Sequence, residues 1–374
     1  MHIGVDLRCL LSPHRTGVGE YTFELLTAIL NSDSENHYYL FYNSFLGQAL
    51  ILPNFTGPNI HLLKTSYPNK LFNFAIKVFK YPKLDSLIMK RFELPRLDYF
   101  FSPHLNFTCL STKTKHILTV HDLTYDLFPE FLTMKQRWWH RLTSPKTQCQ
   151  KAELILTPSE NTKRDIINYY HIPEDKVRVI YPGLNPENSK KINSNLTLPE
   201  KFILFLGTLE PRKNIAGLIT AYESAFHNFN VPHDLVIAGA PGWKNEEVKA
   251  LTRRSPLRDK IHFLGFIEEN NKPALYRAAS VFVYPSFYEG FGFPVLEAMQ
   301  NGTPVITSNR SSLPEITAGT AYLVNPHRSS EIALGLTKII NSSALAERFS
   351  ILGRAQAAKF NWEKSSQDWL SLLK

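Results

Sequence analysis

The sequence has few cysteines, namely Cys9, Cys109 and Cys149 among 374 residues. An odd number at wide spacing argues against a disulfide framework and against a cysteine metal site, and it fits a reducing compartment. The chain enters a strand-like run at once, without the basic and apolar regions of a signal peptide. No apolar run reaches the roughly 18–20 residues that a membrane span needs. These absences predict a cytoplasmic protein.

Two further absences restrict the function. No D-x-D pair that could hold a divalent metal follows a strand, and no nucleic-acid recognition motif accompanies the formal charge of +9. The positive charge therefore indicates other anionic partners, such as nucleotides, phospholipid surfaces or a lipid-linked diphosphate. At 374 residues the chain is long for one hydrophobic core. We therefore expect two domains.

One stretch, 281–298, combines a strand, a glycine loop and the start of a helix. Its first four residues, Val-Phe-Val-Tyr, have the length and composition of a buried parallel strand. The loop that follows carries Gly290 and Gly292, and Pro294 suits the first position of a helix because its missing N–H costs nothing there. Glycines beside the unpaired N–H groups of a helix start let a phosphate approach the backbone. The stretch therefore predicts an anion site.

Two acidic residues accompany this anion site. Glu289 lies in the loop, and Glu297 is expected in the first turn of a helix over 295–301 that stops at Gly302. Both carboxylates could face one ligand. Carboxylates beside a phosphate cradle suit a molecule with hydroxyls at one end and phosphates in its middle, such as a nucleotide sugar.

The run Glu289-Gly-Phe-Gly-Phe-Pro-Val-Leu-Glu297 resembles the E-x7-E motif of retaining family 4 glycosyltransferases. Members of that family have the GT-B fold, in which two Rossmann-like, doubly wound parallel-sheet domains face a cleft. The resemblance implies that Glu289 contacts the transferred sugar and Glu297 the nucleotide ribose. It also implies that Gly290, Phe291 and Gly292 bind the donor.

A second loop carries adjacent cations. After an apolar strand over 202–206 come Arg212 and Lys213, which suit a diphosphate because Arg offers a planar fork and Lys a point charge. Their R-K-N run resembles the diphosphate-binding loop of the family. Many relatives also have an Arg directly after the strand glycine, where this chain has Thr208. Neutralisation of the phosphates would therefore rest on Arg212 and Lys213.

The first half has a strand at 2–6 followed by Gly17 and Gly19 in a loop before an amphipathic helix to about Leu30. A strand, glycine turn and helix form a turn that can bind phosphate, and the pattern resembles the family's N-terminal glycine loop that reaches the donor. These two glycines are therefore predicted to bind the donor.

A later strand of the first half, over 117–120, is followed by His121 and Asp122, at the edge where open α/β sheets bind ligands. The phrase V-H-D-L resembles the family element whose His meets the donor sugar. Asp122 could bind the ligand too, but an Asp before a turn often accepts a hydrogen bond from the backbone instead, as a cap.

Apolar strand patterns alternate with helical segments along the chain, which predicts doubly wound parallel sheets. Gly265 and Phe266 follow the strand expected at 261–264, at an edge where a nucleobase could lie. We expect an N-terminal acceptor-side domain over 1–183, a linker over 184–200, a nucleotide-sugar domain over 201–358, and a terminal helix over 359–374 that crosses back to the first domain.

Residues 67–90 interleave lysines with aromatic and aliphatic residues. Such a segment can seat a helix on an anionic membrane. An amphipathic packing helix with a solvated lysine face is the alternative. Peripheral contact at the inner face of a membrane therefore remains open at this stage.

The family resemblance implies a retaining hexosyltransferase. The cations at the phosphate site and the lack of a D-x-D pair and of a nucleic-acid motif predict that it needs no cofactor or metal and does not bind nucleic acid. It would move a hexose, with mannose slightly favoured, from a nucleotide-sugar donor to a glycan or lipid-linked acceptor. His121, Glu289, Arg212 and Lys213 are the expected catalytic residues. Two alternatives stay open: a nucleotide-sugar epimerase on the same fold, and an inactive membrane-associated partner subunit.

Overall fold

The computed structural model describes residues 1–11, 17–45, 55–185, 198–229 and 231–373. The chain divides into two compact units. The first unit comprises Met1–Leu127, Met134–Gly183 and Asn361–Lys374, and the second comprises Phe128–Thr133 and Leu184–Phe360. Much of the predicted linker, 186–197, lies outside the described residues, as do residues 12–16.

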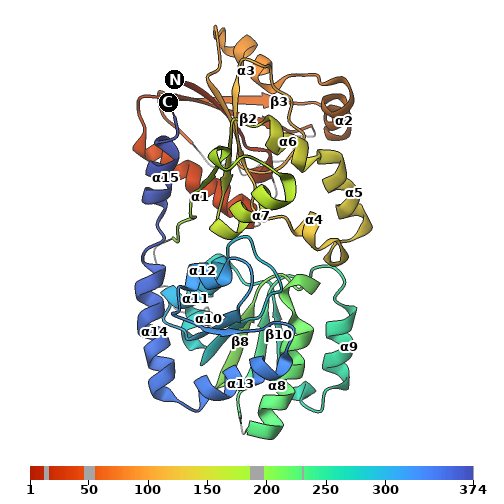
Figure 1. Cartoon of the computed structure of the whole chain (residues 1–374), viewed down its shortest axis with the longest axis vertical. Helices are drawn as coiled ribbons and strands as arrows, with labels where there is room; N and C mark the ends of the chain where they lie inside the picture. The colour runs from red at the N-terminus through yellow and green to blue at the C-terminus, as the bar shows by residue number, and fades with distance from the viewer. Residues whose placement is uncertain (12–16, 46–54, 186–197, 230, 374) are drawn as a thin grey trace. The chain divides into compact units, whose positions relative to one another are not determined.

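The first unit is built on a parallel sheet with the strand order β3-β2-β1-β4-β5-β6-β7 (Figure 1). Buried apolar runs form these strands, as parallel strands covered on both faces require. In the described part of the chain they are β1 (His2–Asp6), β2 (His37–Asn43), β3 (Ile60–Thr65), β4 (Tyr99–Ser102), β5 (Lys115–Thr119), β6 (Leu154–Thr157) and β7 (Val177–Val179).

Helices cover this sheet, and the last helix of the chain returns to it: α15 packs along α1 (Figure 1). The helix α7 begins at an N-cap serine, Ser159, whose side chain accepts a hydrogen bond from the Thr162 N–H at 3.1 Å. The α-helices described in this unit are α1 (Gly17–Ser32), α2 (Asn69–Phe79), α3 (Leu84–Phe92), α4 (Thr124–Leu127), α5 (Met134–Thr143), α6 (Pro145–Lys151), α7 (Glu160–Tyr170) and α15 (Trp362–Leu370).

The second unit contains another parallel sheet, with the order β10-β9-β8-β11-β12-β13. Its described strands are β8 (Phe202–Leu206), β9 (Asp234–Ala238), β10 (Ile261–Gly265), β11 (Val281–Tyr284), β12 (Val305–Ser308) and β13 (Tyr322–Val324). The described α-helices are α8 (Ile215–Phe229), α9 (Glu246–Arg254), α10 (Lys272–Ala278), α11 (Phe293–Gln300), α12 (Leu313–Thr317), α13 (Ser329–Ile340) and α14 (Ser343–Ala357).

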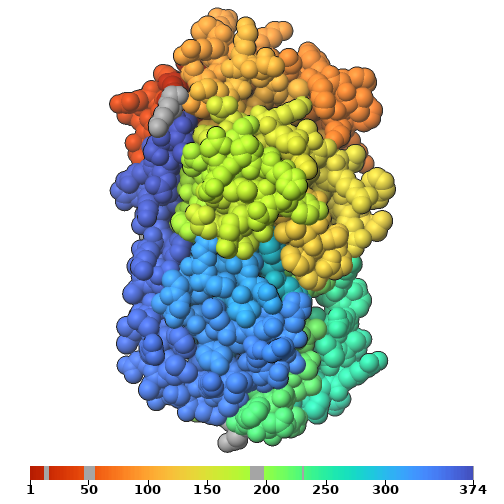
Figure 2. All heavy atoms as spheres, in the orientation of Figure 1, coloured from red at the N-terminus to blue at the C-terminus, as the bar shows by residue number. Residues whose placement is uncertain are grey.

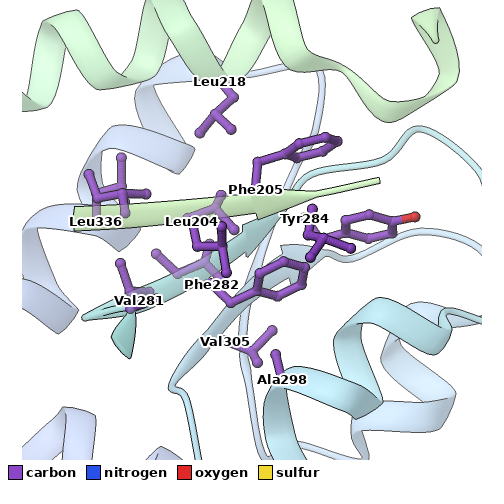
Figure 3. Close-up of a cluster of buried hydrophobic side chains, with 14 of the residues drawn as sticks. Leu204, Phe205, Leu218, Val281, Phe282, Tyr284, Ala298, Val305 and Leu336 are labelled. Carbon is purple, nitrogen blue, oxygen red and sulfur yellow. The ribbon is translucent and has the colours of Figure 1, made fainter. Parts of the chain in front are cut away.

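The core of the second unit lies on both faces of its central strands. Figure 3 shows Leu218 of α8 and Ala298 of α11 on opposite sides of β8 and β11, with Phe282 between the layers. These side chains are fully buried. Because both faces are buried, β8 and β11 are held rigidly, and the loops that follow them start from fixed positions.

The strands expected at 2–6, 117–120, 202–206, 261–264 and 281–284 are present as β1, β5, β8, β10 and β11, with ends that agree within two residues. Three helix predictions need correction. The helix α11 starts at Phe293, so Pro294 is its second residue and Glu297 lies beyond the first turn. Gly17 and Gly19 belong to the first turn of α1 rather than to a loop.

The third correction concerns residues 67–90, which form two helices, α2 and α3, instead of one. The helix α2 ends at Phe79, and the backbone of its C-cap residue Lys80 is left-handed with φ of 55°. Pro82 follows two residues later and cannot continue a helix because it has no N–H and its ring clashes with the preceding turn.

Candidate active site

In the second unit the chain reverses its direction across the sheet between β8 and β11, which are adjacent. Ligands of doubly wound sheets bind outside the carboxyl ends of strands at such a switch point. The loop after β8 contains a short 3-10 turn, η4 (Pro211–Lys213), and the loop after β11 contains Glu289. Two regions far apart in the sequence therefore meet at this edge.

The buried carboxylate of Glu289 joins these two loops. Its Oε2 accepts a hydrogen bond from Arg212 Nη1 at 2.6 Å, and its Oε1 accepts one from Lys213 Nζ at 2.6 Å. Burial alone raises the pKa of Glu289, but the charges of Arg212 and Lys213 outweigh that effect and lower the pKa to about 2. Glu289 is therefore a carboxylate at any physiological pH.

Lys213 is itself buried, with 7% of the residue exposed. Its ammonium donates to the Tyr284 hydroxyl at 2.5 Å as well as to Glu289. Burial and the nearby Arg212 lower the pKa of Lys213, while Glu289 and Glu210 oppose the change. An ammonium has three N–H donors, so these two contacts leave one donor for a ligand.

Arg212 links Glu289 to two further acceptors. Its Nη2 lies 2.7 Å from Glu210 Oε1, and its Nη1 donates to the Tyr288 carbonyl at 2.9 Å. The four charged side chains, two acids and two cations, balance one another. A diphosphate that contacted Arg212 and Lys213 would therefore bring negative charge to a neutral cluster, and each cation would share its donors between phosphate and carboxylate.

Side chains from a third loop hold the Glu289 backbone. The Glu289 N–H donates to Ser311 Oγ at 2.9 Å, and Ser312 Oγ donates to the carbonyls of Glu289 and Phe291 at 3.0 and 2.5 Å. These serines precede α12 and were not identified from the sequence, because nothing in the local pattern links them to residues more than 20 positions earlier. They fix the loop that presents the carboxylate.

The predicted glycines of this loop have different roles. Gly292 has φ of 128°, and a Cβ there would lie 2.7 Å from Ile316 Cδ1 and 2.8 Å from Leu313 Cδ2. The conformation therefore requires glycine, and a side chain would also have to displace the ends of the Ile316 and Leu313 side chains. Gly290 is buried beside it. The Phe291 ring packs against Phe293 and Phe360, which makes its side chain part of the core.

Glu297 lies on α11, apart from the ion pairs of Glu289. Its Oε2 accepts a hydrogen bond from the Tyr276 hydroxyl of α10 at 2.8 Å. Tyr276 is fully buried, whereas Glu297 is partly exposed. The buried phenol therefore orients one oxygen of the carboxylate.

Gly265 and Phe266 lie at the carboxyl end of β10, which is separated from β8 by β9. The Gly265 carbonyl accepts a hydrogen bond from the Gly239 N–H at 2.7 Å, and Gly265 has φ of 71°. Gly239 has φ of 139°, and a Cβ there would overlap the Gly207 carbonyl. The Phe266 side chain extends beyond this tight junction and is 58% exposed.

A short segment from the first half of the chain, Phe128–Thr133, belongs to the second unit. Its Phe131 ring stacks on Phe287 with centroids 5.6 Å apart, and its Phe128 ring lies 5.0 Å from Tyr288. Trp243 Nε1 donates to the Phe131 carbonyl at 2.6 Å. The segment therefore supports the residues just before Glu289.

His121 and the two N-terminal glycines lie in the first unit. His121 Nε2 donates to the Pro103 carbonyl at 2.8 Å, and the Tyr21 ring meets the imidazole edge-on at 4.8 Å. Burial lowers the pKa of His121 despite the opposing effects of Pro103 and Asp122. Asp122 Oδ1 accepts a hydrogen bond from the Thr124 N–H at 2.8 Å, so Asp122 caps the backbone of the following turn.

The structure thus gathers Glu289, Arg212 and Lys213 in the second unit, while His121, Gly17 and Gly19 belong to the first. Within the described residues, no group of three or more His, Cys, Asp or Glu side chains could hold a metal ion. None of the helices in the described ranges is long and apolar enough to cross a membrane.

Two family models match consecutive parts of the sequence. Residues 16–188 match the model described as Glycosyltransferase Family 4, and residues 186–356 match the one described as Glycosyl transferases group 1. The chain belongs to the glycosyltransferases. The predicted membership of glycosyltransferase family 4 and the predicted glycosyltransferase enzyme class are confirmed.

Two named glycosyltransferases are similar to this protein over most of its length. The O-antigen chain mannosyltransferase B of Escherichia coli is 28% identical over 376 residues, covering 96% of this chain and 96% of that one. The O-antigen chain mannosyltransferase RfbU of Salmonella typhimurium is 28% identical over 318 residues and 83% of each chain.

A solved structure, the sucrose-phosphate synthase of Thermosynechococcus elongatus, superposes with a TM-score of 0.76. The match covers 99% of this chain and 97% of that one, at 20% sequence identity. At this identity the likeness concerns the fold alone. It confirms the predicted GT-B architecture of two parallel-sheet domains.

Proposed function

We propose that this glycosyltransferase transfers a hexose from a nucleotide-sugar donor to a glycan or lipid-linked acceptor, with retention of anomeric configuration and without a metal ion. The observation that carries the proposal is the pairing of Glu289 with Arg212 and Lys213 at the switch point of the second unit. It combines an ionised carboxylate with two cations in one buried cluster.

The cations supply the stabilisation that a departing nucleoside diphosphate needs. Positive groups held in place before the reaction stabilise a developing anion by about 3 kcal/mol each, since no reorganisation is needed. Arg212 and Lys213 are held by Glu289, Glu210 and Tyr284. The N-terminus of α11 adds backbone N–H groups and the positive end of the helix dipole. These groups take the place that a divalent metal would occupy, so the reaction requires none.

Glu289 acts on the sugar. A carboxylate with a pKa of about 2 cannot protonate a leaving group, so general-acid chemistry is not its role. It orients sugar hydroxyls and offsets positive charge that grows at the anomeric carbon. Glu297, held by Tyr276, accepts hydrogen bonds from the ribose. For His121, the family resemblance is the sole support for a proposed role at the transferred sugar.

The hexose is assigned to mannose on the relatives alone. Two relatives that cover most of the chain are named O-antigen chain mannosyltransferases. GDP-mannose is therefore the first donor to test, and a sugar-bearing acceptor is the first acceptor.

Peripheral contact with an anionic membrane is the second part of the proposal. On α2 and just after it, large apolar side chains are between 52% and 70% exposed: Leu71, Phe74, Val78, Phe79 and Tyr81. Four lysines and no acidic residue lie within 66–83. Apolar side chains beside uncompensated cations fit the interface of an anionic bilayer.

The helix α5 extends this surface. It exposes Met134, Trp138 and Leu142, and residues 134–151 also contain no acid. Lys77 Nζ of α2 donates to Ser144 Oγ directly after α5 at 2.6 Å, so the two helices are neighbours (Figure 1). Their atoms reach the visible surface of the first unit, orange for α2 and yellow for α5, in Figure 2.

A thermal-shift panel of GDP-, UDP-, ADP- and dTDP-sugars tests the donor proposal. A ligand that binds only the folded protein stabilises it by mass action, by about 2.7 kcal/mol at a hundred times its Kd. We expect one nucleotide to raise the melting temperature clearly above the others, GDP before UDP. An enzyme without this function would show no nucleotide preference. Conversion of the sugar nucleotide into another without nucleotide release would favour the epimerase.

A further inference from the structure

The first unit has its own switch point, and His121 is the one residue there that the donor proposal uses. Strand β1 lies between β2 and β4, so the chain leaves β1 in one direction and later returns on its other side. Polar residues lie at the carboxyl ends of the strands there: Asp6 ends β1 and Arg8 follows it, His104 follows β4, and His121 follows β5. Ligands of parallel sheets bind at this kind of edge.

Arg8 is held tightly but incompletely. Its Nε and Nη2 donate to the fully buried carboxylate of Asp6 at 2.9 and 2.6 Å, and Nη2 also donates to the Phe107 carbonyl at 2.9 Å. Only 7% of the Arg8 side chain is exposed. Its Nη1 is buried, yet it has no hydrogen-bond partner in the described part of the chain. The guanidinium therefore has a donor nitrogen that protein atoms leave unused.

His104 presents a second unused donor. Asn106 Oδ1 accepts from the Phe107 N–H at 2.8 Å, which orients the amide so that Asn106 Nδ2 faces His104 Nε2 at 3.2 Å. Nε2 must then accept, and the neutral ring carries its proton on Nδ1. Nδ1 is buried and, among the described residues, has no partner.

The imidazole of His104 is neutral at ordinary pH. Burial lowers its pKa to about 4, and the nearby Arg8 and His121 act in the same direction while Asp6 opposes them. The Asp6–Arg8 pair is balanced, so the whole cluster has no net charge.

His121 adds an acceptor beside these donors. Its Nε2 donates to the carbonyl of Pro103, the residue before His104, so its neutral ring has an unprotonated Nδ1. Two donor groups and one acceptor on an uncharged cluster match alcohol groups, which both accept and donate hydrogen bonds. A phosphate could use only the donors. A buried donor without a partner destabilises the folded protein, and a hydrogen bond to a ligand hydroxyl would remove that penalty.

We propose that Arg8 and His104 bind the ring hydroxyls of a pyranose beside His121, in a subsite of the first unit. This inference rests on the proposed transferase function in one respect: that function identifies the pyranose as the sugar of either the acceptor or the donor. Arg8 and His104 are specificity residues that contact the substrate, and neither was recognised from the sequence.

Binding of methyl α-D-mannopyranoside and GDP-mannose to the full chain tests the proposal, with affinities measured by NMR and calorimetry. His104→Phe removes the Nδ1 donor and keeps the ring shape. Arg8→Lys keeps a charge for Asp6 but loses the second arm of the fork. Each variant should bind the sugar about tenfold more weakly, as one lost hydrogen bond of 1–3 kcal/mol predicts. GDP alone should bind all variants equally.

His116→Phe is the matched control. His116 is another buried histidine of the first unit, and its Nε2 already has a partner in Ser102 Oγ at 2.9 Å. This variant should bind sugars like the wild type. A loss confined to the methyl glycoside assigns the ring to the acceptor, and a loss confined to GDP-mannose assigns it to the donor. Wild-type affinities in both His104→Phe and Arg8→Lys would overturn the subsite. Absence of nucleotide binding in the wild type would count instead against the proposed function.

Discussion

Glu289 Oε1 lies 2.6 Å from Lys213 Nζ, and both side chains are more than nine-tenths buried. The family resemblance implies that one contacts the sugar and the other the diphosphate, yet here they contact each other. The acid thus holds the cation in place, and it keeps two buried positive charges from standing unpaired. The same contact couples the stability of the second unit to the chemistry of the site.

The variant Glu289→Gln should therefore lose stability as well as activity. Removing one partner of a buried ion pair costs about 3–5 kcal/mol because the remaining charge stays buried. A nucleoside diphosphate can replace that missing negative charge. We expect its affinity, measured by calorimetry, to equal or exceed that of the wild type while turnover is largely lost.

Glu331→Gln on α13 is the control for this variant. Glu331 pairs with Arg328 at 3.2 Å, but both side chains are exposed, so the change should cost less than about 1 kcal/mol. If Glu289→Gln were as stable as Glu331→Gln, or bound the diphosphate much more weakly than the wild type, the role given to the buried pair would be wrong.

The same carboxylate predicts an acid-sensitive second unit. The pKa of Glu289 is about 2 in the folded protein, below its ordinary 4.5. A depressed pKa gives stability that is present above pH 4.5 and is lost as the pH falls toward 2. The shift corresponds to about 3 kcal/mol. In denaturant unfolding, the wild type should lose about 2 kcal/mol of this stability between pH 6 and pH 3, and Glu289→Gln should lose less. Parallel curves would contradict the prediction.

Glu297 should affect donor binding more than the chemical step. Its carboxylate lies on α11 and accepts from Tyr276, away from the Glu289 ion pairs. Glu297→Gln should raise the KM for the donor about tenfold and leave kcat within a few-fold, because a ribose contact is equally strong in the ground and transition states.

Tyr276→Phe distinguishes the effect of the Glu297 carboxylate from the effect of the hydrogen bond that orients it. It removes only the phenol hydrogen bond and should raise the KM less than Glu297→Gln does. A fall in kcat at unchanged KM for Glu297→Gln would place this residue at the sugar instead of the ribose.

The exposed face of α2 should govern binding to anionic vesicles. The double variant Phe74→Ser/Phe79→Ser changes side chains that are 56% and 69% exposed, so the fold should be unaffected. Co-sedimentation with phosphatidylglycerol-containing vesicles should weaken at least tenfold, since each apolar side chain contributes about 1.5 kcal/mol or more when buried. Raising the salt should weaken wild-type binding, because screening reduces the lysine contribution.

Ile351→Ser/Leu352→Ser on α14 is the control for the membrane surface, because both side chains are exposed in the second unit. It should bind the vesicles like the wild type. Equal binding of the α2 variant and this control would show that α2 is an ordinary packing helix.

The strands could be read from the sequence because a buried parallel strand is a short apolar run, as in 202–206 and 281–284. Once the strands are located, the cations and acids that directly follow them can be predicted as site residues, because ligands bind at the carboxyl ends of parallel strands. Their partners were not predicted: Arg212 and Glu289 meet across 77 residues, and Ser311 supports Glu289 from a loop 22 residues away. Arg8 and His104 were missed because their significance lies in buried nitrogens without partners, which no local pattern reveals.

The most direct test follows GDP-mannose with the wild type in excess EDTA by proton NMR, recording nucleotide release and the anomer of mannose set free before it equilibrates. Lys213→Ala is the comparison, since it removes a cation that contacts Glu289. The account predicts release of GDP with the α anomer first, and a rate at least a hundredfold lower in Lys213→Ala. Appearance of the β anomer first, dependence on added Mg²⁺ or Mn²⁺, or an undiminished Lys213→Ala rate would contradict it.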